Sequence, residues 1–244
     1  MIGKKKIILI VILAIIILLL VGAAMYYTKV IHVVKKIDKN KDVVYTSYEK
    51  KADEYTYSIP YINIDSEDAK KINEEIEDYY VTLAEKGVKS DTEGLSVITH
   101  KIEYNAYTNG EILSLIIISY YDNDYVQYRA YNINMYKGKI VTNSDLIALK
   151  KISKEDFLKQ LEELYEKKFI SLYGSKEEFD SGSNSRITEL QKLYEEAYSQ
   201  TISEENYSIE TPIFLNKDGK ISAIAKIYSL AGAMYYYHIL DTNI

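Results

Sequence analysis

The chain has 244 residues, a formal net charge of −6 and no cysteine. Proteins that bind nucleic acid usually present a basic stripe, so this acidic balance argues against nucleic acid as a partner. Without cysteine, the chain offers neither a thiolate metal site nor the attachment point of a lipoprotein-type lipid anchor. Hydrophobic residues make up 47% of the chain, which is enough for a substantial core at this length.

An almost unbroken apolar run covers residues 7–27, directly after three lysines at positions 4–6. About 20 residues at a rise of 1.5 Å match the ~30 Å hydrocarbon core of a bilayer. We therefore predict a transmembrane signal-anchor over 7–27, a cytoplasmic stub over 1–6, and a polar, basic stalk over 28–44. The lysines place the N-terminus inside and the rest of the chain outside. The alternative is cleavage near residues 21–24 and secretion, although the run is longer than the usual apolar region of a signal peptide.

The first elements after the stalk are predicted from local signals. A short strand covers residues 55–64, where Pro60 favours a sheet edge. A helix follows over about 67–86, capped by Asp65 or Ser66. Its apolar positions recur at helical spacing. They are Ala69, Ile72, Ile76, Tyr79, Tyr80 and Leu83.

Strand patterns separated by turns come next. They cover residues 95–107, 112–121, 125–136 and 140–142. Asn109-Gly110 is the strongest short hairpin signal, and residues 122–124 and 137–139 supply two further turns. Residues 112–121 are apolar on both faces, as expected of a central strand covered by helices. We therefore predict a meander of antiparallel hairpins.

The second half begins with a helix capped at Ser153, with Asp156 completing an approximate capping box. Its buried stripe consists of Phe157, Leu158, Leu161, Leu164, Tyr165, Phe169 and Leu172. Gly174 ends this helix, a loop covers residues 179–185, and a second helix covers about 186–200. Three strands are predicted to follow, over residues 208–215, 220–230 and 234–240.

The order of the elements predicts the α+β class, with antiparallel sheet(s) and segregated helices preceded by one transmembrane helix. We place a first α+β extracytoplasmic module over residues 45–145. A second module over residues 146–244 is expected to pack on the first.

No motif in the chain indicates a particular enzymatic reaction. The three histidines, His32, His100 and His238, have no metal-ligand spacing, and no Gly-x-Ser-x-Gly elbow or phosphate-binding glycine loop occurs. The acidic turn at residues 122–124 lacks the calcium-loop pattern and is best explained by turn chemistry. The acidic helix residues Glu162, Glu163, Glu166, Glu195 and Glu196 are interpreted as solvated faces. We therefore predict no enzyme, no cofactor and no metal.

Tyrosine is the most distinctive residue type, with 26 copies against four phenylalanines and no tryptophan. One explanation is compositional, because lysine, isoleucine, asparagine and tyrosine are abundant together in proteins from AT-rich bacterial genomes. The other is a tyrosine-rich binding face, since tyrosine offers a large contact area at low entropic cost. On the second view the candidate ligand-binding residues are Tyr120, Tyr121, Tyr125, Tyr128, Tyr235, Tyr236 and Tyr237, half of which strand alternation would place in the core.

Short motifs follow one another in a fixed order. They are Ile59-Pro60-Tyr61-Ile62, Ile72-Asn73, the strand 113–121, Gly138-Lys139, Asp145-Leu146, Thr211-Pro212-Ile213-Phe214, Asp218-Gly219 and Ala231-Gly232-Ala233. Over about residues 45–240 this order resembles the tandem extracytoplasmic domains of lysozyme-binding anti-sigma factors. The same tandem occurs at the N-terminal side of membrane-anchored peptidoglycan deacetylases. The resemblance implies a ligand-binding or sensing module.

The chain also departs from both kinds of protein. Six residues precede the apolar run and Ile244 is the last residue, so we expect neither a cytoplasmic anti-sigma domain nor a deacetylase domain. The leading hypothesis is a non-catalytic, single-pass bacterial envelope module that binds a lysozyme-like protein or cell-wall glycan. One rival is an envelope hydrolase, similar to a peptidoglycan deacetylase, with an unrecognised active site. The other is a structural subunit that pairs through its membrane helix or a sheet edge.

Overall fold

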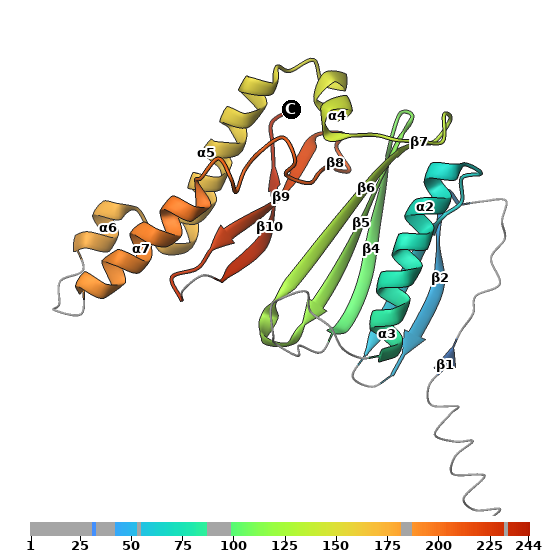
Figure 1. Ribbon diagram of the computed structural model, residues 1–244, viewed down its shortest axis with the longest axis horizontal. Coiled ribbons are helices and arrows are strands. Elements are labelled where there is room, and N and C mark those ends of the chain that lie inside the picture. Colours follow the sequence, from blue (N-terminus) through green and yellow to red (C-terminus); the bar gives the residue numbers. More distant parts are fainter. Residues whose placement is uncertain (1–30, 33–41, 53–54, 87–98, 182–186, 232–233) are drawn as a thin grey trace, which may run out of the picture.

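The computed structural model describes residues 31–32, 42–52, 55–86, 99–181, 187–231 and 234–244 (Figure 1). The predicted stub, the transmembrane segment and most of the predicted stalk lie outside these ranges. Within the described ranges, no helix combines the length and apolarity needed to cross a membrane. The transmembrane segment therefore stays a prediction.

The described residues form an α+β fold with two sheets, which confirms the predicted class. The first sheet has seven strands in chain order, and the second has the order β10-β9-β8. The strands are β1 (Ile31–His32), β2 (Val44–Lys51), β3 (Thr56–Ile62), β4 (Thr99–Asn109), β5 (Ile112–Tyr121), β6 (Val126–Asn134), β7 (Lys139–Ile140), β8 (Ile213–Leu215), β9 (Ile221–Tyr228) and β10 (Tyr235–Asp241). The helical segments are α2 (Glu67–Ile76), the π-helical η1 (Glu77–Val81), α3 (Thr82–Lys86), the 3-10 turn η2 (Asp122–Asp124), α4 (Asn143–Leu149), α5 (Lys154–Tyr173), α6 (Lys176–Ser181) and α7 (Ile187–Thr201).

The seven-stranded sheet is mixed, so the expectation of purely antiparallel sheets is wrong. β3 and β4 run parallel, with Thr56 opposite Lys101 and Tyr57 opposite Ile102. The connection between these strands contains α2, η1 and α3. A helical crossover returns the chain to the end from which it started, which makes the flanking strands parallel.

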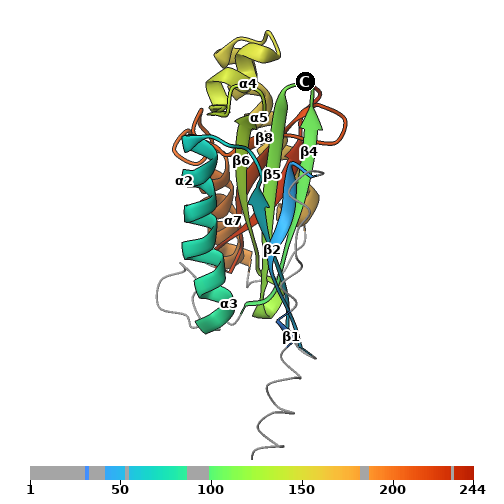
Figure 2. The same ribbon diagram turned by 90° about the vertical axis from the view of Figure 1, so that its right-hand side faces the viewer.

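The predicted helix over residues 67–86 forms as α2, η1 and α3 in succession, and it lies along one face of the sheet (Figure 2). Ser66 caps it, because its hydroxyl accepts a hydrogen bond from the backbone amide of Ala69 at 3.1 Å. The predicted apolar stripe is buried, apart from the half-buried Tyr79. Its contacts with β3, β4 and β5 form a continuous core.

Asn73 explains the Ile-Asn motif of this helix. Its side-chain oxygen accepts a hydrogen bond from the Ile62 amide at 2.8 Å, and its side-chain nitrogen donates to the Ile62 carbonyl at 2.9 Å. β3 pairs with β4 only at Thr56 and Tyr57, so Ile62 has no strand neighbour on that side. The Asn73 amide therefore satisfies the backbone of Ile62 as a neighbouring strand would.

β5 is buried along almost its whole length, as predicted for a central strand. Leu113, Leu115 and Ile117 face α2, whereas Ile116 and Ile118 face the second sheet. Helices therefore cover only one face of β5, because β8 to β10 cover the other. The second sheet in turn packs against α5 and α7, so the fold has four layers in the order helix, sheet, sheet, helix (Figure 1).

A buried polar network joins the two sheets. Asn132 on β6 donates a hydrogen bond to the carbonyl of Ile213 at 2.8 Å. Ser114 on β5 donates to the side-chain oxygen of Asn132 at 2.6 Å and accepts from the backbone amide of Leu215 at 3.0 Å. Both side chains are less than 10% exposed. The network therefore fixes the short strand β8 on the central strands.

Two short helices depart from the sequence prediction. The Asp145-Leu146 step lies inside α4, whose capping box joins Thr142 and Asp145. The predicted module boundary at residue 145 falls in this helix, and the division into two modules stays a prediction. α6 occupies the first part of the predicted loop over residues 179–185, while residues 182–186 lie outside the described ranges.

The start of the strand predicted over residues 95–107 lies outside the described residues, and its remainder forms β4. The other predicted elements agree with the structure to within a few residues, except the strand predicted over residues 208–215. Only β8 forms there, because residues before it fold into a turn. Thr211 closes this turn, accepting a hydrogen bond from the Ser208 amide at 3.0 Å. Pro212 then removes a backbone donor.

The turn between β6 and β7 yields a stability prediction. Gly138 has a φ of +62° and lies directly against Ser66, so an added Cβ would collide with the Ser66 side chain. Gly138→Ala should therefore lower the free energy of unfolding by about 2–4 kcal/mol, through backbone strain and overpacking. Gly110 is the matched control, because its φ is +59° and nothing lies within 4 Å of an added Cβ. Gly110→Ala should cost only about 1 kcal/mol, and equal losses in chemical denaturation would contradict the close packing.

Candidate functional site

The structure brings four of the seven candidate tyrosines together. Tyr125 follows η2, and its ring centroid lies 6.3 Å from that of Tyr236 and 6.3 Å from that of Tyr237. Tyr235 and Tyr237 are in edge-on contact, with centroids 5.4 Å apart. These four residues, named here the tyrosine cluster, connect the start of β6 with the start of β10. All four are half-buried, so each presents part of its ring to solvent.

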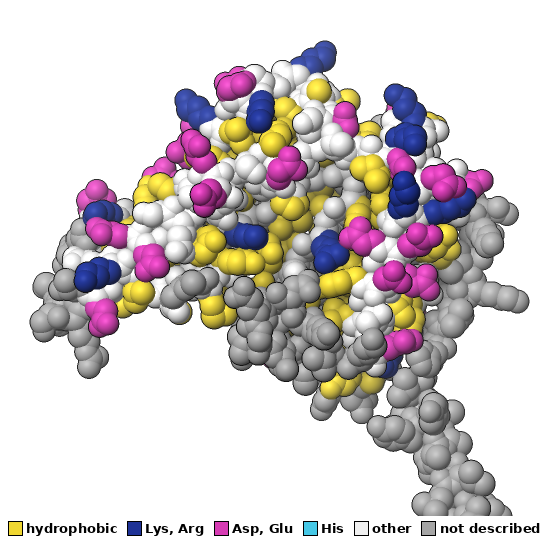
Figure 3. Space-filling view, viewed as in Figure 1, with side chains coloured by type: hydrophobic (Ala, Val, Ile, Leu, Met, Phe, Trp, Pro, Cys, Tyr) yellow, Lys and Arg dark blue, Asp and Glu magenta, His cyan; other side chains and the backbone are white. Residues whose placement is uncertain are grey.

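The tyrosine cluster lies beside the apolar contact between the two sheets. Tyr128 and Tyr237 pack against Ile118, Phe214 and neighbouring residues of this contact. From this side of the molecule, hydrophobic side chains gather where β6 and β10 approach one another, with charged side chains around them (Figure 3). An aromatic surface held by a packed core is well suited to binding, because little side-chain entropy is lost on contact.

Tyr120 and Tyr121 border the tyrosine cluster. The Tyr121 ring centroid lies 5.7 Å from that of Tyr125, and Tyr120 packs with Tyr128 and Tyr237 against the contact between the two sheets. Tyr121 is 0% exposed and donates a hydrogen bond to Gln127 at 2.9 Å, so it cannot contact a partner, and its selection as a contact residue is corrected here. Tyr120 points to the opposite face of β5 and donates to Glu103 at 2.5 Å. The Lys101 ammonium lies 4.8 Å from the Tyr120 ring centroid. Alternation along β5 places these two neighbouring side chains on opposite faces of the sheet.

Burial favours the neutral form of two hydroxyls in this region. Burial raises the pKa of Tyr237, and the hydrogen bond to Tyr235 raises it further. Burial also raises the pKa of Tyr128. Lys226 adds a positive charge, with its ammonium 4.9 Å from the centroid of the Tyr235 ring. These hydroxyls can therefore donate and accept hydrogen bonds, which suits recognition of a polar partner.

Arg129 on β6 joins this strand to the helix that contains Tyr79 and Glu75. Its guanidinium lies 3.9 Å from the centroid of the Tyr79 ring and forms an ion pair with Glu75 at 3.1 Å. The same Glu75 carboxylate accepts a hydrogen bond from Tyr131 at 3.0 Å. Sequence reasoning did not identify this network, because its members come from a helix and a strand more than 50 residues apart.

The histidines do not converge on one site. His100 is 4.0 Å from Asp122 on the surface, whereas His238 lies on β10 opposite Ala225, and the side chain of His32 is outside the described part. In the described ranges, no group of three or more His, Asp and Glu residues has an arrangement that could hold a metal ion.

His238 predicts a pH dependence of stability. Burial and then the nearby Lys168 ammonium lower the pKa of His238 from 6.5 to about 4. Between pH 6.5 and pH 4, His238 is protonated in the unfolded chain but neutral in the folded chain. Stability that is present above pH 6.5 is therefore lost as the pH falls toward 4. His238→Gln should flatten this part of the profile, as measured by unfolding midpoints of both proteins between pH 7 and pH 4.5. Because carboxylates contribute equally to both proteins, parallel profiles would contradict the assignment.

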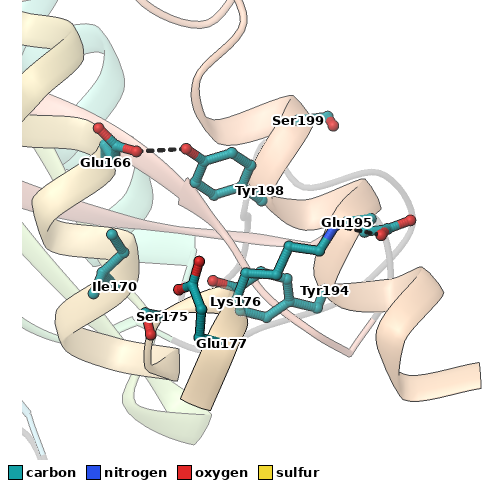
Figure 4. A pocket seen from close by; sticks show the side chains of 9 residues that line it. All are labelled: Glu166, Ile170, Ser175, Lys176, Glu177, Tyr194, Glu195, Tyr198 and Ser199. Atoms are coloured by element: carbon teal, nitrogen blue, oxygen red, sulfur yellow. Dashed lines mark hydrogen bonds and ion pairs between the residues drawn. The ribbon is translucent and has the colours of Figure 1, made fainter. Parts of the chain in front are cut away.

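A second candidate site is a pocket of about 440 Å³ between α5, α6 and α7 (Figure 4). Tyr194 and Tyr198 lie one turn apart on α7 and stack with nearly parallel rings, 6.2 Å between centroids. Around them lie three carboxylates, Glu166, Glu177 and Glu195. Sequence reasoning treated Glu166 and Glu195 as solvated helix faces, because nothing local showed that α5 and α7 bring them to one cavity.

Two interactions organise the pocket. Tyr198 donates a hydrogen bond to Glu166 at 2.5 Å, and this bond, followed by burial, raises the pKa of Tyr198 to about 12. Lys176 forms an ion pair with Glu195 at 2.9 Å, which lowers the pKa of that carboxyl. The pocket lining thus contains three carboxylates and one ammonium, so it carries two uncompensated negative charges at neutral pH.

Comparison with known proteins adds no further assignment, because no family model matches the chain and no curated protein matches its sequence. The resemblance to the tandem envelope domains therefore stays a prediction.

Proposed function

We propose that the protein is a membrane-anchored, extracytoplasmic module of the bacterial cell envelope that binds or senses a ligand and performs no catalysis. The observation that supports this most strongly is the tyrosine cluster, which gathers Tyr125 and Tyr235–Tyr237 from two sheets into one half-exposed aromatic surface. Partly exposed, rigidly held aromatic rings are typical of the energetically dominant residues in binding sites.

We further propose that the partner is a protein similar to lysozyme rather than a free wall glycan. The tyrosine cluster and the acidic pocket are separate surfaces, so one ligand that used both would have to be larger than a sugar unit. A cationic protein could cover the aromatic surface and still reach the carboxylates. A net charge of −6 would also favour the encounter with such a protein.

The proposed orientation of the chain in the membrane can be tested with single introduced cysteines, because the chain has no cysteine of its own. Asn105 is exposed on β4, and Asn105→Cys should react with a membrane-impermeant maleimide in intact protoplasts. Ile2→Cys, in the predicted stub, should react only after lysis. The opposite pattern would reverse the orientation, and labelled Asn105→Cys protein in the culture medium would show that the anchor is cleaved.

The function can be tested with the full chain reconstituted in lipid nanodiscs. A lysozyme should bind it with a micromolar or lower Kd, and soluble peptidoglycan fragments should remain chemically unchanged during prolonged incubation. Binding of neither lysozyme nor fragments would contradict the proposal. Chelator-sensitive or serine-reagent-sensitive turnover of the fragments would support the rival hydrolase.

A further inference from the structure

We propose that the pocket between α5, α6 and α7 receives a lysine or arginine side chain of the partner protein. This inference rests on the proposed function and names the chemistry by which the partner is recognised. It concerns a cavity far along the chain from Tyr125, so it can fail without affecting the tyrosine cluster.

The shape and walls of the pocket fit a single cationic side chain. A volume of about 440 Å³ accommodates an extended lysine or arginine side chain with some water. The partly exposed ring of Tyr198, which stacks on the buried ring of Tyr194, provides an aromatic wall, to which a cation is attracted by the ring quadrupole. Phe169 supports both rings from below, at 5.2 Å and 5.5 Å between centroids.

The charges of the pocket favour an ammonium or guanidinium guest. Lys176 forms an exposed ion pair with Glu195, so the carboxylates that a guest would contact are Glu166 and Glu177. Glu177 is exposed at the pocket, and Glu166 has one carboxylate oxygen in a hydrogen bond with Tyr198 (Figure 4). A carboxylate has several lone-pair positions, so both residues can accept further hydrogen bonds from a cationic guest.

The helices that form the pocket also pack on the sheet that carries Tyr235–Tyr237. Phe169 contacts Tyr173, with ring centroids 4.9 Å apart, near the end of α5. α5 and α7 pack on β9, and β9 pairs with β10, the strand that carries Tyr235–Tyr237. One protein surface can therefore cover both sites, with a cationic side chain in the pocket and apolar contacts at the tyrosines.

The first test uses variants of the full chain in nanodiscs. Glu177→Gln should raise the Kd for lysozyme about fivefold at low salt, and the effect should shrink as sodium chloride is added. Glu163→Gln is the matched control, because it removes the same charge from an exposed residue of α5 that does not line the pocket. Both glutamates are exposed, so neither replacement should disturb folding.

The second test uses a small probe and does not depend on lysozyme. Nα-acetyl-lysine methyl ester at millimolar concentration should shift the methyl NMR signal of Ile170, which lines the pocket and can be assigned with Ile170→Val. The Nε-acetylated ester lacks the positive charge and should leave the signal in place.

The two tests distinguish a failure of the pocket inference from a failure of the proposed function. A shift with the lysine ester, in a chain that fails to bind lysozyme, would support the pocket and reject the proposed partner. Lysozyme binding that is equally strong for wild type, Glu177→Gln and Glu163→Gln, together with no shift from the lysine ester, would overturn the pocket inference. The tyrosine cluster would then remain the proposed binding surface.

Discussion

Replacing Asn132 with leucine is expected to lower the free energy of unfolding by about 2–5 kcal/mol. Leucine has the same branched shape and the same number of side-chain heavy atoms, so the change removes polar contacts without opening a cavity. It leaves the Ile213 carbonyl without its donor and the Ser114 hydroxyl without its acceptor, both in the buried contact between the sheets. Each buried polar group that loses its partner costs about 1–3 kcal/mol.

The loss can be measured by chemical denaturation of the full chain in detergent micelles, followed by circular dichroism. Asn105→Leu is the matched control, because it makes the same replacement at an exposed position of β4 and should change stability by less than about 0.5 kcal/mol. If the Asn132 variant were as stable as this control, the polar network would not be what fixes β8 on the central strands.

Replacing Tyr125 with alanine is expected to weaken lysozyme binding by at least about 30-fold, the loss typical of a central aromatic contact. Tyr125 lies at the centre of the tyrosine cluster, in contact with Tyr236 and Tyr237, and its truncation removes the ring and the support of its neighbours. Tyr125→Phe keeps the ring and should lose only a few-fold in affinity. The measurement is the Kd of each full-length variant in nanodiscs.

Tyr136→Ala supplies the control for this series. Tyr136 is the most exposed large hydrophobic side chain of the described residues, at 80% exposure, and it lies in the turn between β6 and β7, away from the tyrosine cluster. Its removal should leave the Kd unchanged. A loss at Tyr136 equal to that at Tyr125 would move the binding surface to the other end of β6.

The parts of the fold that were predictable from sequence depend on local chemistry. Ser66 and Ser153 begin their helices because their hydroxyls accept hydrogen bonds from backbone amides at 3.1 Å and 3.0 Å. Asn109-Gly110 closes a hairpin because Gly110 adopts a positive φ without a side-chain clash. Each of these signals lies within a few residues of its effect.

The features of the fold that the sequence did not predict depend on contacts between distant segments. The parallel pairing of β3 with β4 follows from the helical crossover, and the cover on the second face of β5 comes from strands about 100 residues later. α4 has a local signal in the Thr142 and Asp145 capping box, but its seven residues are too few for a helical period to emerge. The capping box was therefore the local signal that could have identified this helix.

The candidate sites show the same limit. Tyrosine abundance pointed to Tyr125 and Tyr235–Tyr237 and also to Tyr121, which the fold buries completely. Strand alternation predicts that some tyrosines face the core, but only the packed sheets decide which. The pocket was not predictable, because Glu166 and Glu195 lie on different helices and only the packing of α5 against α7 brings them together.

Hydroxyl-radical footprinting of the unmodified full chain shows whether a lysozyme-like protein covers the tyrosine cluster. With lysozyme present, oxidation of Tyr125 and Tyr235–Tyr237 should fall several-fold, while oxidation of the distant, exposed Tyr136 should stay constant. Unchanged oxidation of the tyrosine cluster, or protection of Tyr136 alone, would contradict the account.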